Sequence, residues 1–118
     1  MIFDVGVFIA LDNPAQGCVV AALVEWMLAE GVTPVTTEAV LAQAWRHPAT
    51  QVPMAMLVKT TEVHPFGVPQ ITGMRCAGSG TNDVVDAGLA VLAEQLDLTI
   101  LTTDPDDMVR LNARHRAL

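Results

Sequence analysis

Met1-Ile-Phe-Asp-Val-Gly-Val-Phe-Ile-Ala-Leu11 opens the chain, and it is apolar throughout except for Asp4 and one glycine. We interpret Ile2 to Ile9 as the first β-strand, because such a continuous apolar run predicts a central strand in a sheet that is covered on both faces. A carboxylate rarely survives in a buried strand unless something compensates its charge. A strand offers Asp4 no helix end to cap. This residue is therefore the first candidate for a functional role.

Strands and helices alternate along the rest of the chain. Ala15 to about Glu30 and Asn82 to Leu96 have the apolar spacing of helices, and Leu98 to Leu101 is a second buried strand. Such alternation with short connections predicts an α/β protein with a three-layer α/β/α fold and a central parallel sheet. At 118 residues, we expect a single domain over 1–118. The other predicted elements are a short strand at 32–35, an edge strand at 60–65, and helices at about 36–45, 51–59, 68–77 and 105–113.

Composition limits the class of protein. Charged residues interrupt every apolar run, so no membrane span is predicted, and the N-terminus has no pattern of a signal peptide, so we expect a cytoplasmic protein. A net charge of −7 with only six basic residues disfavours electrostatic capture of nucleic acid over a broad surface. Any RNA contact must therefore depend on bound metal or on a few placed cations, for which Arg46 and Arg75 are the candidates.

Acidic residues lie at or near the ends of three separated segments. Asp104 directly follows Leu101-Thr-Thr103, and Asp83 and Asp86 are one turn apart at the head of a predicted helix. In parallel α/β sheets the functional crevice lies at the carboxyl ends of the strands. If the fold brings Asp4, Asp86 and Asp104 together, their like charges require a cation or a substrate.

Simpler roles are open for several of these acids. Asp83 has the position of a helix-start charge, which the helix dipole favours. Asp104, followed by Pro105, has the pattern of an N-cap. We interpret Asp106 and Asp107 as a solvated first turn.

Four segments follow one another along the chain: Ile2-Phe-Asp-Val-Gly-Val-Phe-Ile-Ala-Leu11, Val40-Leu-Ala-Gln-Ala-Trp-Arg46, Ser79-Gly-Thr-Asn-Asp-Val-Val-Asp-Ala87 and Leu101-Thr-Thr-Asp-Pro-Asp-Asp107. In this order they resemble the motifs of PIN-domain proteins and, more narrowly, of the VapC-type ribonuclease toxins of bacterial toxin-antitoxin modules. The resemblance covers nearly the whole chain, and the last two segments are the most specific. The step of 18 residues from Asp86 to Asp104 is similar to the spacing of that family's third and fourth acids.

By this resemblance, Asp4, Asp86 and Asp104 match three of the four acids with which the family holds Mg²⁺ or Mn²⁺, and Asp83 is a further candidate ligand. Thr103 matches a position where the family often has a polar residue, whose hydroxyl can orient a carboxylate or the attacking water. The resemblance implies a metal-dependent endoribonuclease that hydrolyses RNA phosphodiesters. It also implies a homodimer and a cognate antitoxin protein.

An apolar surface for these partners is predicted from methionine and tryptophan side chains. Ordinary core packing is an equally open role for each of them. They are Trp26, Met27, Trp45, Met54, Met56 and Met74.

The chain departs from the family pattern at Gln43, where the family has a glutamate. Glutamine is nearly isosteric, but it brings no negative charge and cannot act as a base. Glu38 is no substitute, since five residues along a helix turn it about 140° away, and we expect it to serve the helix N-terminus. Two interpretations follow. The chain is a working ribonuclease toxin with Gln43 in its catalytic site, or it is a weakened or inactive PIN-like module that binds RNA or a partner without cutting.

Overall fold

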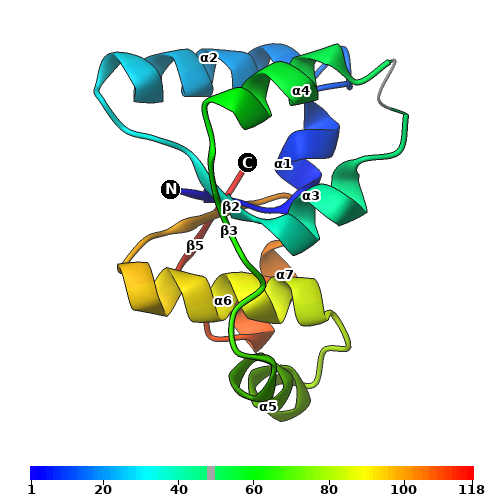
Figure 1. Cartoon of the computed structure of the whole chain (residues 1–118), viewed down its shortest axis with the longest axis vertical. Helices are drawn as coiled ribbons and strands as arrows, with labels where there is room; N and C mark the ends of the chain where they lie inside the picture. The colour runs from blue at the N-terminus through cyan, green and yellow to red at the C-terminus, as the bar shows by residue number, and fades with distance from the viewer. Residues whose placement is uncertain (48–49) are drawn as a thin grey trace.

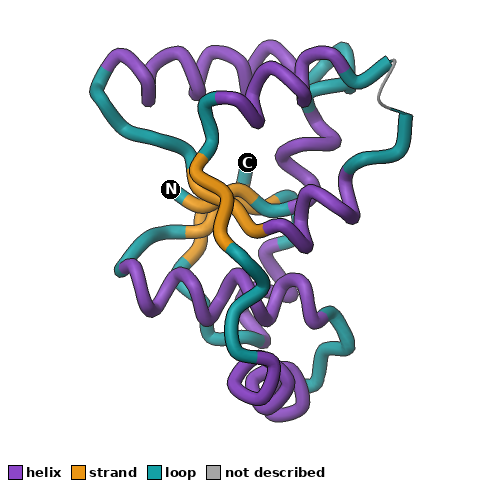
Figure 2. The backbone as a smooth tube through the Cα atoms, viewed as in Figure 1, coloured by secondary structure: helices purple, strands orange, loops and turns teal. Residues whose placement is uncertain are grey.

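The computed structural model describes residues 1–47 and 50–118, which form five strands and seven helices. Figure 1 shows the sheet edge-on between two layers of helices, and Figure 2 shows the strands gathered at the centre. This arrangement confirms the predicted three-layer α/β/α fold. The elements are β1 (Ile2–Phe3), α1 (Val5–Ala10), α2 (Gly17–Ala29), β2 (Val35–Thr37), α3 (Glu38–Ala44), α4 (Val52–Lys59), β3 (Glu62–His64), α5 (Pro69–Ser79), α6 (Val84–Leu96), β4 (Ile100–Thr102), α7 (Pro105–Arg110) and β5 (His115–Ala117).

The strands of the sheet are all parallel and lie in the order β3-β2-β1-β4-β5. β1 is therefore central and β3 lies at an edge, as predicted. Ile2 pairs with Val35 on one side and with Ile100 on the other. Because the chain moves from β1 first to β2 on one side and later to β4 on the other, the winding reverses between β1 and β4. In such sheets the ligand crevice lies outside the carboxyl ends of the strands at this reversal.

Helices cover both faces of the sheet. α1, α2, α3 and α4 form one layer, and α5, α6 and α7 form the other (Figure 1). The core between the layers includes Phe3, Phe8, Met54, Leu89 and Ile100, which have no exposed surface. No helix in the described part of the chain is long and apolar enough to cross a membrane.

The first strand is much shorter than predicted. β1 ends at Phe3 and a helix runs over Val5–Ala10, so the predicted strand from Ile2 to Ile9 is wrong beyond residue 3. Asp4 causes the change, because its carboxylate accepts a hydrogen bond from the Val7 N–H at 3.0 Å and so caps α1. The prediction that Asp4 has no helix end to cap is therefore wrong. α1 is largely apolar because it packs against the sheet, α2 and α3.

The C-terminal elements also differ in their bounds. Asn112 has a left-handed backbone (φ 51°), and the helix predicted to reach residue 113 ends at Arg110. Asp97, also left-handed (φ 53°), ends α6, and β4 starts only at Ile100. β5 was not predicted because His115-Arg-Ala117 is polar and half-exposed, which is typical of an edge strand whose pairing with β4 the sequence does not reveal.

Candidate functional site

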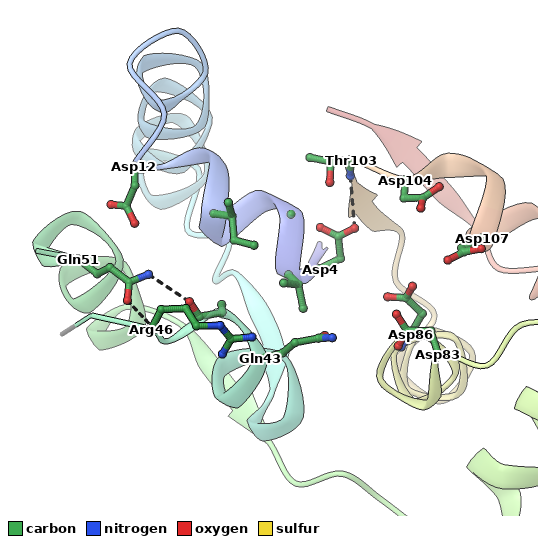
Figure 3. Close-up of a pocket in the computed structure, with 14 residues that line it drawn as sticks. Asp4, Asp12, Gln43, Arg46, Gln51, Asp83, Asp86, Thr103, Asp104 and Asp107 are labelled. Atoms are coloured by element: carbon green, nitrogen blue, oxygen red, sulfur yellow. Dashed lines mark hydrogen bonds between the residues drawn. The ribbon is translucent and has the colours of Figure 1, made fainter.

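A cavity of about 470 Å³ opens at the carboxyl ends of β1 and β4, where the winding of the sheet reverses. This volume lies within the range of ligand sites, about 300–1,000 Å³. Figure 3 shows two groups of polar side chains, and a further aspartate, Asp12, which lies on the side of Gln51 and Arg46. The six predicted catalytic and metal-binding residues all line the cavity: Asp4, Gln43, Asp83, Asp86, Thr103 and Asp104. The acid wall consists of Asp4, Asp83, Asp86, Asp104 and Asp107, and the α3 wall consists of Gln43, Ala44, Arg46 and Gln51.

Asp4 lies at the back of the acid wall and is almost completely buried. One carboxylate oxygen accepts from the Val7 N–H at 3.0 Å, and the other accepts from the Thr102 hydroxyl and from the Thr103 N–H at 3.3 Å. Burial raises the pKa of Asp4 above its ordinary value, while these hydrogen bonds act in the opposite direction. The three donors fix the orientation of the carboxylate.

The threonine hydroxyl that orients Asp4 comes from Thr102, whereas the resemblance pointed to Thr103. Thr102 is fully buried, donates its hydroxyl proton to Asp4 and accepts from the Asp104 N–H at 2.9 Å. Thr103 lines the cavity but reaches Asp4 through its backbone N–H. Asp104 is exposed at the N-cap position of α7 and makes no capping hydrogen bond with its side chain, so its carboxylate is available to the cavity.

Gly6 is required where α1 meets the loop after β4. A Cβ atom built on Gly6 lies 1.6 Å from the Thr103 Oγ1 and 2.8 Å from the Thr103 Cβ. Only a glycine therefore lets the Thr103 backbone approach α1 closely enough to donate to Asp4. The apolar stretch at the start of the chain thus positions both Asp4 and the Thr103 N–H that donates to it.

Three carboxylates from α6 and α7 converge on one point. Carboxylate oxygens of Asp83, Asp86 and Asp107 lie within 4.8 Å of one another. Asp83 also caps α6, because its carboxylate accepts from the Val85 N–H at 3.0 Å and the Asp86 N–H at 3.1 Å. Asp83 therefore has both roles: it caps the start of α6, and it belongs to the acid wall.

Asp107 is a member of this group that was not predicted. It was interpreted as part of a solvated turn, but it is half-buried and lines the cavity. The signal in the sequence is its spacing, since Asp104 and Asp107 are three residues apart at the start of α7 and so face the same side.

Asp86 is buried, and its burial and the neighbouring acids of this wall raise its pKa. Burial, followed by the negative charges of Asp83 and Asp4, raises the pKa of Asp86 to about 7. A carboxyl group with this pKa is only partly ionised near neutral pH, and a nearby positive charge favours its ionised form. Carboxylate oxygens are the ligands that Mg²⁺ and Mn²⁺ prefer. The donor set of the acid wall therefore fits a hard divalent cation.

The α3 wall is neutral or positively charged. Gln43 is exposed on α3 and lines the cavity. Gln51 is buried, and its Oε1 accepts from the N–H groups of Arg46 and His47, both at 2.8 Å, while its Nε2 donates to the Ala44 carbonyl at 3.1 Å. This side chain was not predicted to belong to the cavity. It fixes the turn that carries Arg46.

Solved structures share this fold at low sequence identity. A chain of VapBC2 from Rickettsia felis, bound to a DNA fragment from their promoter, has a TM-score of 0.74 and 16% identity over 100% of this chain and 99% of that chain. A chain of FitAcB from Neisseria gonorrhoeae has a TM-score of 0.71 and 14% identity over 97% and 94%. A chain of FitAB bound to the IR36 DNA fragment has a TM-score of 0.69 and 14% identity over 98% and 93%. The sequence matches no protein-family model and no curated protein.

Proposed function

We propose that this chain is a divalent-metal-dependent endoribonuclease, the toxin of a type II toxin-antitoxin module. The observation that carries the proposal is the convergence of Asp83, Asp86 and Asp107, whose carboxylate oxygens lie within 4.8 Å of one another beside the carboxyl ends of β1 and β4. The likeness of the fold to chains of VapBC2 and FitAB supports it. All five acids of this wall, Asp4, Asp83, Asp86, Asp104 and Asp107, lie in the motifs that resemble VapC-type toxins.

The acid wall would hold Mg²⁺ or Mn²⁺. Asp83, Asp86 and Asp107 are the nearest set of ligands, with Asp4 and Asp104 beside them. When bound, the cation supplies Lewis acidity toward a phosphodiester and makes a water molecule more acidic. In the absence of the cation, the Asp86 carboxyl is partly protonated near neutral pH, because its pKa is about 7. A cation held by Asp83, Asp86 and Asp107 would favour the ionised form of the Asp86 carboxyl.

Two residues beside the acids have narrower roles in this proposal. Asp4 presents its carboxylate in one orientation, because Thr102 and Thr103 both donate to the same oxygen. The Gln43 amide can donate a hydrogen bond to a phosphate oxygen, but it cannot take a proton from water. The chain must therefore function without the fourth acid of the family pattern.

A second candidate function follows from Gln43 itself. Its amide lies on the α3 wall, opposite the acid wall, and brings no charge to the cavity. Without the fourth acid of the family pattern, the site should bind a cation more weakly. The chain would then be a PIN-like module that binds RNA or a partner without cutting. The two candidates share the metal and the cavity, and they differ in whether a phosphodiester is hydrolysed.

The proposed antitoxin and the proposed second copy of the chain need an apolar surface. Trp26 on α2 and Met56 on α4 are more than half exposed, and an apolar cavity of about 320 Å³ lies between these helices. Met74 on α5 is also exposed. Met27 and Met54, which were open candidates for this surface, are buried core residues. The α2–α4 surface therefore supports the proposal of a protein partner.

Cleavage of RNA across a titration of Mg²⁺ and Mn²⁺ tests the proposed function. We expect wild-type cleavage to require the metal and to fall on the order of a hundredfold in Asp86→Asn, because the variant loses a carboxylate at the point where three converge. Asp106→Asn is the matched control, since Asp106 is exposed on α7 and lines none of the cavities described above. It should cleave like the wild type.

Absence of cleavage by the wild type at every metal concentration would contradict the proposal. Cleavage that survives Asp86→Asn would do the same, since the activity would then come from another site or from a contaminant. Cleavage that is absent in the wild type and appears in Gln43→Glu would establish the second candidate for the native chain.

A further inference from the structure

Two of the chain's six basic residues lie along a groove that includes the acid wall. Arg46 lines the cavity described above, and Arg110 lines a second cavity of about 610 Å³. The two cavities share Gln43, Asp83 and Asp107 as lining residues, so they form one continuous groove. Along this groove the order is Arg46, the acid wall and then Arg110.

The two groove arginines differ from the paired arginines elsewhere in the described chain. Arg75 lies 2.7 Å from Glu94 and also donates to the Leu111 carbonyl, which removes it as a candidate phosphate contact. Arg46 has no carboxylate partner among the described residues and donates only to the backbone carbonyls of Ala42 and Trp45.

Arg110 has a partner, but that partner is itself a groove residue. The Arg110 guanidinium lies 3.4 Å from the Asp107 carboxylate, and its side chain is 60% exposed. An exposed pair of this kind contributes little free energy. A cation at the acid wall would compete for Asp107 and would leave Arg110 available to another anion.

Arg46 is held at the groove through its backbone. The buried Gln51 carboxamide accepts from the Arg46 N–H at 2.8 Å and donates to the Ala44 carbonyl, so the turn after α3 is fixed. The backbone from which the exposed Arg46 side chain extends is therefore held in place at the edge of the cavity. A fixed backbone lowers the entropy that is lost when a ligand is bound.

From this arrangement we propose that a single strand of RNA lies along the groove, with one phosphate at the acid wall and the phosphates on either side of it bound by Arg46 and Arg110. The inference rests on the proposed function and adds the course of the substrate and the residues that bind it. A molecule with a net charge of −7 can hold a polyanion only where its cations are concentrated. A single strand is favoured because the target phosphate must reach Asp86, which is 8% exposed.

Binding of a fluorescent single-stranded RNA to the full chain tests this inference. The anisotropy titration uses Ca²⁺ as the oxygen-liganded cation and a series of salt concentrations, and it compares the wild type with Arg46→Gln, Arg110→Gln and Arg116→Gln. Arg116 is the matched control, because it is exposed on β5, lines neither cavity of the groove and has the same charge. Each variant removes one positive charge.

We expect Arg46→Gln and Arg110→Gln each to weaken binding by roughly three- to tenfold and to reduce the slope of log K against log salt by about 0.7. Arg116→Gln should change neither quantity. The inference is overturned if the wild type does not bind, if both groove variants bind like the wild type, or if Arg116→Gln weakens binding to the same extent.

The experiments on binding and on cleavage can refute the inference and the proposed function independently. A wild type that cleaves RNA while both groove variants bind normally refutes the inference and leaves the proposed function standing. A wild type that binds through Arg46 and Arg110 but never cleaves refutes the proposed ribonuclease and supports the inferred course of the RNA.

Discussion

The two walls of the cavity are built differently. In the acid wall, Asp4 is held by three donors and Asp83 by two, and the wall backs onto the buried ends of β1 and β4. In the α3 wall the Gln51 side chain accepts from the N–H groups of Arg46 and His47, whereas the side chains of Gln43 and Arg46 are exposed. Hydrogen bonds therefore hold the side chains of Asp4 and Asp83 in the acid wall, whereas in the α3 wall they hold Gln51 and the backbone of Arg46.

This difference separates two tasks. Like charges that are held close together raise the pKa of Asp86 and favour a cation, which requires fixed geometry. An exposed amide and an exposed guanidinium can adapt to a bound molecule. The proposed metal site depends on the acid wall, because three carboxylates converge there, whereas Asp12 lines the cavity on the side of Gln51, away from them.

The largest expected effect comes from breaking the contact behind the acid wall. Gly6→Ala places a Cβ atom 1.6 Å from the Thr103 Oγ1 and 2.8 Å from the Thr103 Cβ, so the loop after β4 must move. We expect the free energy of unfolding to fall by about 3 kcal/mol. Chemical denaturation measures it.

Gly73→Ala is the control for this change. Gly73 lies within α5, and a Cβ atom added there meets no atom within 4 Å. The variant should be unchanged or more stable by about 0.5–1 kcal/mol, because alanine favours a helix over glycine. Equal stability of Gly6→Ala and the wild type would show that the loop is not held against α1.

The second effect tests the crowding of charge in the acid wall. The pKa of Asp86 is about 7 in the folded chain and 3.8 is its ordinary value, so the folded state keeps a proton that the unfolded state releases. Without metal, the wild type should therefore lose stability as the pH rises from about 4 to about 7. Asp86→Asn removes this loss and should be more stable than the wild type by about 2 kcal/mol at about pH 8, with a smaller difference near pH 4.

Denaturation in the presence of a chelator, at several pH values, measures this difference. Asp106→Asn is the control and should follow the wild type at every pH, since Asp106 is exposed. A difference between Asp86→Asn and the wild type that does not change with pH would contradict the crowding of the acid wall.

The smallest expected effect comes from making the α3 wall more like the acid wall. Gln43→Glu adds a carboxylate to the cavity, and we expect Mn²⁺ to bind about tenfold more tightly, which corresponds to about 1.4 kcal/mol. Gln95→Glu adds the same charge on the exposed side of α6, away from the cavity, and should not change the affinity. Equal gains in both variants would mean that net charge alone attracts the cation.

The sequence allowed us to predict that Asp4, Asp86 and Asp104 share a site, because each of them lies beside a recognisable strand or helix. The length of the first strand could not be predicted, since α1 is apolar throughout, at exposed Ile9 as well as at buried Val7 and Phe8, and so gives no periodic signal. The turn at Asp4 depends on its hydrogen bonds with Val7, Thr102 and Thr103, two of which lie almost a hundred positions away.

The residues that support the site were harder to predict than the acids. Thr102 and Thr103 are adjacent and chemically alike, and only the register of β4 against β1 determines which hydroxyl reaches Asp4. Gln51 carries no charge and belongs to no motif, so its role is visible only once α3 and α4 are in place. Asp107 could have been predicted from its spacing to Asp104.

Calorimetric titration of the chain with Mn²⁺ tests the central claim most directly. The claim is that the acid wall holds a divalent cation through Asp83, Asp86 and Asp107. It predicts saturable binding to the wild type, weakened at least about tenfold in Asp86→Asn and in Asp107→Asn and unchanged in Asp106→Asn. Absence of saturable binding by the wild type would contradict it, and so would Asp86→Asn and Asp107→Asn variants that bind Mn²⁺ with the affinity of the wild type.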